Sequence, residues 1–155
     1  MSVLLTKSCQ YAIQAVLFLA TKQKNKPVLQ REIAESLDIP VHFLGKILQQ
    51  LVKQNIVSSQ KGKLGGFFLS YPFAKVTLYK IAQIIDGENF LDGCIVGFPF
   101  CSDKSPCPLH EDWKKIKEDI IATMNTKHTE QLSNELQKKL VHLHLNNTLE
   151  GEKND

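Results

Sequence analysis

Hydrophobic positions between residues 30 and 57 fall into two sets, each with the spacing of a helix. The first set is Ile33, Ala34 and Leu37, and the second is Phe43, Leu44, Ile47, Leu48 and Leu51. Residues three and four apart share a helix face, so each set predicts a short amphipathic helix. Between them lies the segment 38–40, with apolar Ile39 inside the turn and Pro40 suited to open the second helix. Two helices joined in this way predict a helix-turn-helix.

The segments on either side of this helix pair extend it into a larger unit. Residues 6–22 are apolar around most of a helical circumference, which predicts a buried helix. Residues 56–59 and 66–69 are strand-like, and a basic, glycine-rich segment (60–65) lies between them. Two strands around such a tip predict a β-hairpin, the wing of a winged helix.

The second half of the chain predicts helices separated by one long loop. Thr77 can cap a helix over residues 78–86, and Gly87 can end it. Residues 88–110, called the cysteine loop below, are rich in Gly, Pro, Phe and Cys. A long helix follows, with an apolar face made by Trp113, Ile116, Ile120 and Met124. A further amphipathic stretch carries Leu132, Leu136, Leu140 and Leu143.

These elements predict a mainly α fold with a small β-hairpin wing: a winged helix-turn-helix plus a long C-terminal helix. We divide the chain into four regions. They are the winged helix-turn-helix domain (1–87), the cysteine loop (88–110), the long helix with its appended amphipathic segment (111–143), and a polar tail that we expect to be disordered (144–155).

Composition places the chain among globular proteins. It has 155 residues, of which 43% are hydrophobic and 23% charged. No apolar run reaches the roughly 18–20 residues of a membrane span. The N-terminus has no basic segment followed by an apolar run and a small-residue cleavage site. We therefore expect a cytoplasmic protein with no membrane partner.

The net charge of +3 is unevenly distributed along the chain. Residues 1–75 hold ten basic and three acidic side chains, a net charge of +7. Residues 76–155 hold nine and thirteen, a net charge of −4. Basic charge is thus concentrated in the helix-turn-helix half, where it can bind phosphate, although a merely solvated basic surface gives the same pattern.

The predicted helix-turn-helix indicates binding to double-stranded DNA, because such a unit places its second helix in the major groove. The residues in base-reading positions of that helix are His42, Gly45, Lys46 and Gln49, with Gln50 beside them. His, Lys and Gln can all pair with base donors or acceptors. Phosphate contacts are expected from the side chains of Lys7, Arg31, Lys61 and Lys63 and from the wing backbone at Gly62, Gly65 and Gly66. The alternative is a helical protein–protein module.

Three of the four cysteines, Cys94, Cys101 and Cys107, fall within fourteen residues, whereas Cys9 is far away. In a reducing compartment such a group indicates metal ligands before disulfides. Thiolates bind soft metals and iron–sulfur clusters, and His110 is a candidate fourth ligand. The gaps are longer than those typical of structural zinc sites. Unligated thiols, and a His110 with no metal role, remain alternatives.

The chain resembles the Rrf-type winged-helix transcription regulators, the IscR/NsrR-like family. The resemblance covers residues 3 to about 125 and rests on several segments in the same order. They are LTKSCQYAIQAVLFLA, REIAESLDIPVHFLGKILQQLVKQNIV, the wing KGKLGGFFL, the helix VTLYKIAQIIDG, and the spaced cysteines ending in CPLHEDW.

This resemblance implies a homodimer on a near-palindromic operator, held by the long helix from Glu111 to about Asn125. It also implies an iron–sulfur cluster whose presence or redox state alters operator affinity. By position, Cys94, Cys101 and Cys107 match the family's three cluster ligands, and His110 matches the histidine that completes the IscR site. That histidine favours [2Fe–2S]. Because the first cysteine gap is six residues where five is usual, [4Fe–4S] stays open.

Two further positions depart from the family pattern. Gly45 replaces an acidic base-reading residue of IscR, so the operator sequence does not carry over. Gln10 occupies the place from which NsrR-like members supply an acidic ligand, and glutamine is a poor ligand. The neighbouring Cys9 is an alternative ligand, but we favour a role for it as a small apolar residue of the helix.

Other functions fit the sequence less well. It contains no nucleotide-binding loop, no catalytic His/Asp set and no second cluster motif, so we do not expect an enzyme. The alternatives are a zinc-stabilised or cluster-free regulator or adaptor and, less favoured, a small redox protein.

Overall fold

The computed structural model describes residues 4–70 and 76–139. Its helices are α1 (Lys7–Ala20), α2 (Gln30–Leu37), α3 (Val41–Lys53), α4 (Leu78–Asp86) and α5 (His110–Thr126), and its strands are β1 (Val57–Gln60) and β2 (Gly66–Leu69). Residues 129–139 are also helical. The predicted mainly α fold with a hairpin wing is therefore confirmed. None of the helices in the described ranges is long and apolar enough to cross a membrane.

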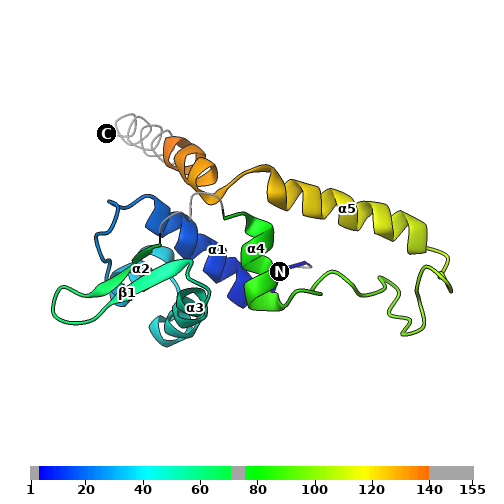
Figure 1. The fold of residues 1–155 in the computed structure, drawn as a ribbon, viewed down its shortest axis with the longest axis horizontal. Coiled ribbons are helices and arrows are strands. Elements are labelled where there is room, and N and C mark those ends of the chain that lie inside the picture. The colour runs from blue at the N-terminus through cyan, green and yellow to red at the C-terminus, as the bar shows by residue number, and fades with distance from the viewer. Residues whose placement is uncertain (1–3, 71–75, 140–155) are drawn as a thin grey trace, which may run out of the picture.

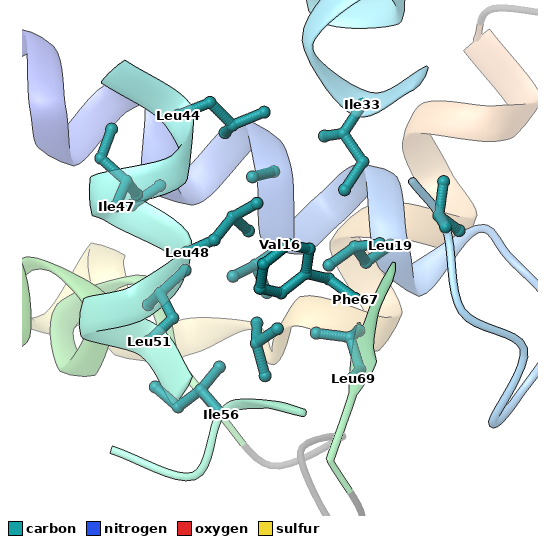
Figure 2. Packing of buried hydrophobic residues seen from close by; sticks show 14 of the residues in the cluster. Val16, Leu19, Ile33, Leu44, Ile47, Leu48, Leu51, Ile56, Phe67 and Leu69 are labelled. Carbon is teal, nitrogen blue, oxygen red and sulfur yellow. The ribbon is translucent and has the colours of Figure 1, made fainter. Parts of the chain in front are cut away.

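The core lies where α1, α2, α3 and the hairpin meet (Figure 1). Figure 2 shows Val16 of α1, Ile33 of α2 and Leu48 of α3 pointing toward one another, with Phe67 and Leu69 closing the core from the strand. The predicted apolar positions of both helix-turn-helix helices are buried, except that Leu37 is half-buried and Phe43 is exposed. The apolar spacing identified in the sequence thus marks the faces that pack inward.

The turn between α2 and α3 is tight because Asp38 adopts a left-handed conformation with φ 54°. The backbone N–H of Ile39 then donates to the carbonyl of Ala34 at 2.9 Å, and the Ile39 side chain is buried. Pro40 is the N-cap of α3, as its position in the sequence predicted. A short polar residue such as Asp tolerates this conformation better than most.

The wing is an antiparallel hairpin in which Val57 pairs with Leu69 and Gln60 with Gly66. Its first strand begins one residue later than predicted. Val28 joins β2 through two backbone hydrogen bonds with Phe67, each 2.8 Å long. A Cβ on Gly66 would lie 2.4 Å from the carbonyl oxygen of Val28, and Gly66 has φ 146°. This glycine therefore serves the close approach of two segments of the chain itself.

The cysteine loop and α5 together, called the arm below, extend away from the remainder of the described chain, called the body (Figure 1). The loop ends at residue 109, since His110 already belongs to α5. The C-terminal end of α5 returns to the body, where the Thr77 hydroxyl donates to Asn125 at 2.8 Å. The Ser133 hydroxyl donates to the Leu17 carbonyl at 3.1 Å and ties the last helical segment to α1. The predicted positions Leu140 and Leu143 and the polar tail (144–155) lie outside the described residues.

Candidate cysteine centre and nucleic-acid interface

The three cysteines of the cysteine loop come together at the distal end of the arm. The Sγ atoms of Cys94, Cys101 and Cys107 all lie within 4.8 Å of one another, and those of Cys94 and Cys107 are 3.6 Å apart. All four cysteines of the chain are in the described part, and none forms a disulfide. The geometry therefore brings three free thiols to one point.

Local turns in the loop explain how such widely spaced cysteines converge. The N–H of Gly97 donates to the Cys94 carbonyl at 2.9 Å, and Gly97 has φ 84°, which favours glycine. Ser102 and Ser105 exchange two backbone hydrogen bonds, at 3.2 and 3.0 Å. The N–H of His110 donates to the Cys107 carbonyl at 3.0 Å. Each inter-cysteine segment is thus folded back on itself, and the gap lengths in the sequence give no measure of the sulfur separations.

His110 faces the thiols with one ring nitrogen and a carboxylate with the other. Its Nδ1 lies 3.1 Å from the Sγ of Cys101, and its Nε2 lies 2.9 Å from the Oδ1 of Asp103. Lys114 donates to the same Asp103 oxygen at 3.1 Å. The hydrogen bond from His110, followed by that from Lys114, lowers the pKa of Asp103. Histidine ligands in metal sites are commonly oriented by a carboxylate in this way.

Sequence reasoning missed Asp103. It is seven residues from His110 and sits in a polar stretch of the loop, so neither its spacing nor its surroundings marked it. Only the turn at residues 102–105 brings its carboxylate to the imidazole.

The thiols differ in how readily they ionise. Burial opposes ionisation of Cys94, but hydrogen bonds from the backbone of Phe98 and Val96 and from the neighbouring thiols outweigh it and lower its pKa to about 7. At Cys101 a backbone hydrogen bond from Cys107 lowers the pKa. Burial and the two other thiols raise it by more than this, so the net shift of the pKa is upward. Cys94 is therefore about half ionised at pH 7, and thiolates are the form that binds metals.

The start of α5 closes the cysteine centre from one side. The indole N–H of Trp113 donates to the Gly93 carbonyl at 2.9 Å, which holds the loop against the helix. Trp113 and Lys117 line a small hollow together with the three cysteines and His110. Trp113, predicted to be part of an apolar stripe, therefore also fixes the loop that carries Cys94.

The residues present fit a soft metal ion or an iron–sulfur cluster. The donor set is three thiols and one imidazole nitrogen, all from one short segment, and both kinds of centre accept these ligands. The shortest contacts in the set are Cys94 with Cys107 at 3.6 Å and Cys101 with His110 at 3.1 Å, and all three sulfurs lie within 4.8 Å of one another.

Cys9 takes no part in this centre. It is fully buried in α1, where it packs with Ala82 and Met124. Burial, and to a smaller extent the charge of Asp86, raises the pKa of its thiol to about 12. Cys9 therefore behaves as the small apolar helix residue that the sequence favoured.

The second candidate site is the exposed face of α3. Four of the predicted base-reading residues, His42, Gly45, Lys46 and Gln49, line one shallow surface hollow. Gln30 from the start of α2 and Lys53 from the end of α3 line the same hollow, together with Gln50. Sequence reasoning missed Gln30 and Lys53, because Gln30 belongs to the other helix of the pair and Lys53 lies a full turn beyond the expected face.

The predicted phosphate-binding residues are exposed on three separate parts of the body. Lys61, Gly62 and Lys63 form the tip of the wing, and Arg31 is held only loosely, 4.0 Å from Glu35. The Lys7 ammonium lies 5.1 Å from the centre of the Tyr11 ring, and that ring packs edge-on against Phe43 of α3. Tyr11 therefore links Lys7 to α3. Lys63 lies elsewhere, in a different hollow that Lys24 and Lys26 also line.

Comparison with known proteins gives a consistent result. A model of the Rrf2 family, described as iron-dependent transcriptional regulator, matches residues 5–135. The chain is 32% identical over 113 residues (72% of this chain and 78% of the relative) to a protein of Aquifex aeolicus assigned by name as an HTH-type transcriptional regulator. It is 26% identical over 121 residues (78% and 74%) to the HTH-type transcriptional regulator IscR of Klebsiella pneumoniae.

Two solved structures share the fold. One is CymR (YrzC), the global cysteine regulator of B. subtilis, with a TM-score of 0.70, 20% identity, and coverage of 86% of this chain and 98% of CymR. The other is T. potens IscR, with a TM-score of 0.65, 22% identity, and coverage of 86% and 88%.

Proposed function

The chain belongs to the Rrf2 family of iron-dependent transcriptional regulators, and on this premise we propose that an iron–sulfur cluster on the cysteine loop controls its affinity for operator DNA. Because the family consists of transcriptional regulators, the protein is a DNA-binding regulator and not an enzyme. The proposal concerns what it senses and how the signal reaches the DNA.

The observation that carries the proposal is the convergence of Cys94, Cys101, Cys107 and His110. Three sulfur atoms within 4.8 Å of one another, and the imidazole Nδ1 3.1 Å from the sulfur of Cys101, supply four candidate ligands. Asp103 accepts the hydrogen bond of Nε2, which leaves the lone pair of Nδ1 free to bind a metal. The low pKa of Cys94 keeps one ligand ready in its binding form.

We expect the cluster to be [2Fe–2S]. The histidine beside Cys101 supports this nuclearity, because a histidine completes the cluster ligands in the IscR-like members that the chain resembles. When bound, such a cluster supplies a centre that gains or loses an electron or is itself lost. The protein's own contribution is to hold the loop in one conformation around it.

A mononuclear zinc site is the second candidate, and one observation favours it. Two thiolates on one tetrahedral zinc lie about 3.8 Å apart, from a zinc–sulfur distance of about 2.3 Å. The Cys94–Cys107 separation of 3.6 Å and the compactness of all three sulfurs suit that arrangement as well. Zinc would stabilise the loop, but the zinc ion itself neither gains nor loses an electron.

The arm supports a homodimer as the active form. Five apolar side chains near the cysteine centre are exposed, namely Ile95, Val96, Phe98, Phe100 and Leu109. On α5 the predicted stripe is divided, because Met124 is buried and Ile120 packs against the body, whereas Ile116 is 48% exposed. We propose that Ile116 and the loop residues pack against a second copy of the chain, and that the symmetric dimer binds a near-palindromic operator.

We propose that α3 lies in the major groove and that the wing contacts the phosphate backbone. Lys46, His42 and Gln49 are exposed on one face of α3, and Lys53 lines the same hollow. The cysteine loop joins the end of α4 to the start of α5, so ordering the loop fixes how each body sits on the dimer. Linkage requires that operator DNA change the affinity for the cluster by the same factor by which the cluster changes the affinity for DNA. The corresponding coupling free energy is typically about 1–3 kcal/mol.

The test is to purify the full chain anaerobically and to measure absorbance, iron, sulfide and zinc. Iron and sulfide in equal amounts, near two of each per chain, are expected; a colourless protein with one zinc would contradict the cluster. The variant Cys94→Ala/Cys101→Ala/Cys107→Ala should bind DNA like the cluster-free wild type at every site tested. Cys9→Ala, which removes a cysteine outside the centre, should keep the cluster. Equal DNA affinity of holo, cluster-free and triple-variant protein would show that the loop is structural.

A further inference from the structure

Gly45 occupies a groove-facing position of α3 yet contributes no side chain there. His42, Gly45, Lys46 and Gln49 follow one another at spacings of three, one and three residues, so they share one face of the helix. His42, Lys46 and Gln49 are exposed, whereas Gly45 is half-buried. Something therefore covers the backbone at Gly45.

The covering group is the carboxamide of Gln30. A Cβ atom on Gly45 would lie 2.6 Å from Nε2 of Gln30 and 3.2 Å from both its Cδ and its Oε1. The distance of 2.6 Å is too short for non-bonded atoms, so the Gln30 carboxamide fills the space in which a side chain at position 45 would begin. Gln30 is the first residue of α2, and its side chain crosses from one helix of the pair to the other.

A hydrogen bond fixes the carboxamide in this place. Nε2 of Gln30 donates to the carbonyl of Val41, in the first turn of α3, at 2.8 Å. That carbonyl belongs to the same helix turn as His42, so the amide is anchored to the backbone of the helix it covers. Gln30 then lines the surface hollow together with His42, Lys46 and Gln49.

The anchored amide retains one donor and one acceptor. A glutamine amide nitrogen carries two hydrogens, and the Val41 carbonyl accepts one of them. Among the described residues, the second N–H and the Oε1 atom have no other hydrogen-bond partner. This pair complements the N7 acceptor and the N6 donor of adenine, which is the base that glutamine reads in the major groove.

We propose that Gln30 is a specificity-determining residue that reads an adenine at the base pair facing Gly45, in place of the side chain that α3 lacks there. The inference rests on the proposed function, in which α3 lies in the major groove. It adds a base-reading residue from α2, whereas the base-reading residues predicted from the sequence all lie on α3.

The experiment selects binding sites from a duplex library with a randomised central region, using the full-length wild-type protein. Duplexes carrying each of the four base pairs at every position of the selected site are then measured for affinity. Wild type should prefer adenine at one position of each half-site. Gln30→Ala should lose that preference by roughly 5- to 150-fold, the worth of one bidentate base contact, and keep its preferences elsewhere. Gln30→Met, which fills similar space without hydrogen-bonding groups, should lose the same preference.

Gly45→Ala supplies a second, independent variant. Its Cβ displaces the Gln30 carboxamide, which is the far end of a flexible side chain, so the fold should persist while the same base preference falls. Once Gln30→Ala has removed the carboxamide, Gly45→Ala should have little further effect on that base pair. This non-additivity identifies the two residues as one recognition unit.

Lys46→Ala tests base reading by α3 independently of Gln30, because it should relax the preference at a different base pair. If Lys46→Ala relaxes a base and Gln30→Ala does not, α3 recognition stands and the role of Gln30 is wrong. An equal loss on all four base pairs with Gln30→Ala overturns base reading in favour of a phosphate contact. If the wild type selects no sequence at all, the proposed function itself fails.

Discussion

The body and the arm of this protein are held together by different means. In the body, α1, α2, α3 and the hairpin share a continuous core in which Val16, Leu44, Leu48 and Leu51 are inaccessible to solvent. In the arm, the only described hydrophobic residues that are buried are Leu91, Cys107 and Met124, while several large apolar side chains remain exposed. The body therefore contains the means of its own stability, whereas the arm lacks a core.

This difference indicates that the body and the arm have different roles. A buried core of this kind fixes one conformation, so the body can present α3 and the wing rigidly. The arm has short turns, a few side-chain hydrogen bonds and the cysteine centre, and such regions open more easily than packed cores. A ligand or a partner chain can therefore change the conformation of the arm without disrupting the core of the body. Four predictions test this contrast.

The largest expected effect is in the reactivity of two cysteines. In metal-free protein at pH 7, the body's Cys9, with a pKa of about 12 and no exposure, should alkylate more than about a thousandfold more slowly than Cys94 of the arm, with a pKa of about 7. The difference in thiolate fraction is only partly offset by the greater nucleophilicity of the more basic thiolate.

The pH dependence of the Cys94 reaction checks the assignment. A lowered pKa means that the thiolate is present above about pH 7 and is lost as the pH falls through that value. The rate measured by mass spectrometry with iodoacetamide should therefore be half-maximal near pH 7. Comparable rates at Cys9 and Cys94 would mean that the body opens as easily as the arm.

The next effect is on stability. Leu48→Ala, at a position with no exposure, should lower the free energy of unfolding by about 2–5 kcal/mol, because it leaves a cavity in the body. The matched arm variant Ile95→Ala, at a residue 54% exposed, should change it by less than about 0.5 kcal/mol in the monomer. Urea unfolding followed by circular dichroism measures both, and similar losses would refute the contrast.

Dimerisation should depend on the arm alone. Ile116→Glu places a charge on the exposed part of the α5 stripe and should weaken the dimer by at least about tenfold, since symmetry buries the charge twice. Lys115→Glu, at the neighbouring exposed position, serves as the control. Sedimentation at micromolar concentration gives the measurement. A wild-type chain that is monomeric there would contradict the proposed partner for the arm.

The smallest effect concerns the charges that meet DNA. Lys61→Ala on the wing should weaken binding to all sequences alike, by a few-fold at moderate salt, and reduce the slope of log affinity against log salt by about one per protomer. Lys104→Ala in the arm removes the same charge from an exposed site and should leave the slope unchanged. Fluorescence anisotropy across a salt series distinguishes them, and equal slope changes would place DNA contacts on the arm as well.

The sequence by itself determined the elements and the set of chemically important residues. Helical spacing from Ile33 to Leu51, the break at Asp38-Ile39-Pro40 and the glycine-rich tip predicted the winged helix-turn-helix, because these signals act between neighbours in the chain. The three cysteines and His110 were identified by residue type, since few side chains can bind a soft metal. Such information is local or compositional and needs no knowledge of distant contacts.

Tertiary structure decided how these residues meet. It brought Asp103 to His110 and Gln30 to Gly45, and it buried Met124 against Cys9 and Ala82, dividing a stripe that the sequence presented as one surface. It also showed that Gly66 permits the close approach of Val28, in addition to the backbone contact with DNA that the sequence predicted. Each of these depends on the distance between groups on different segments, and sequence spacing does not fix that distance once turns fold the chain back on itself.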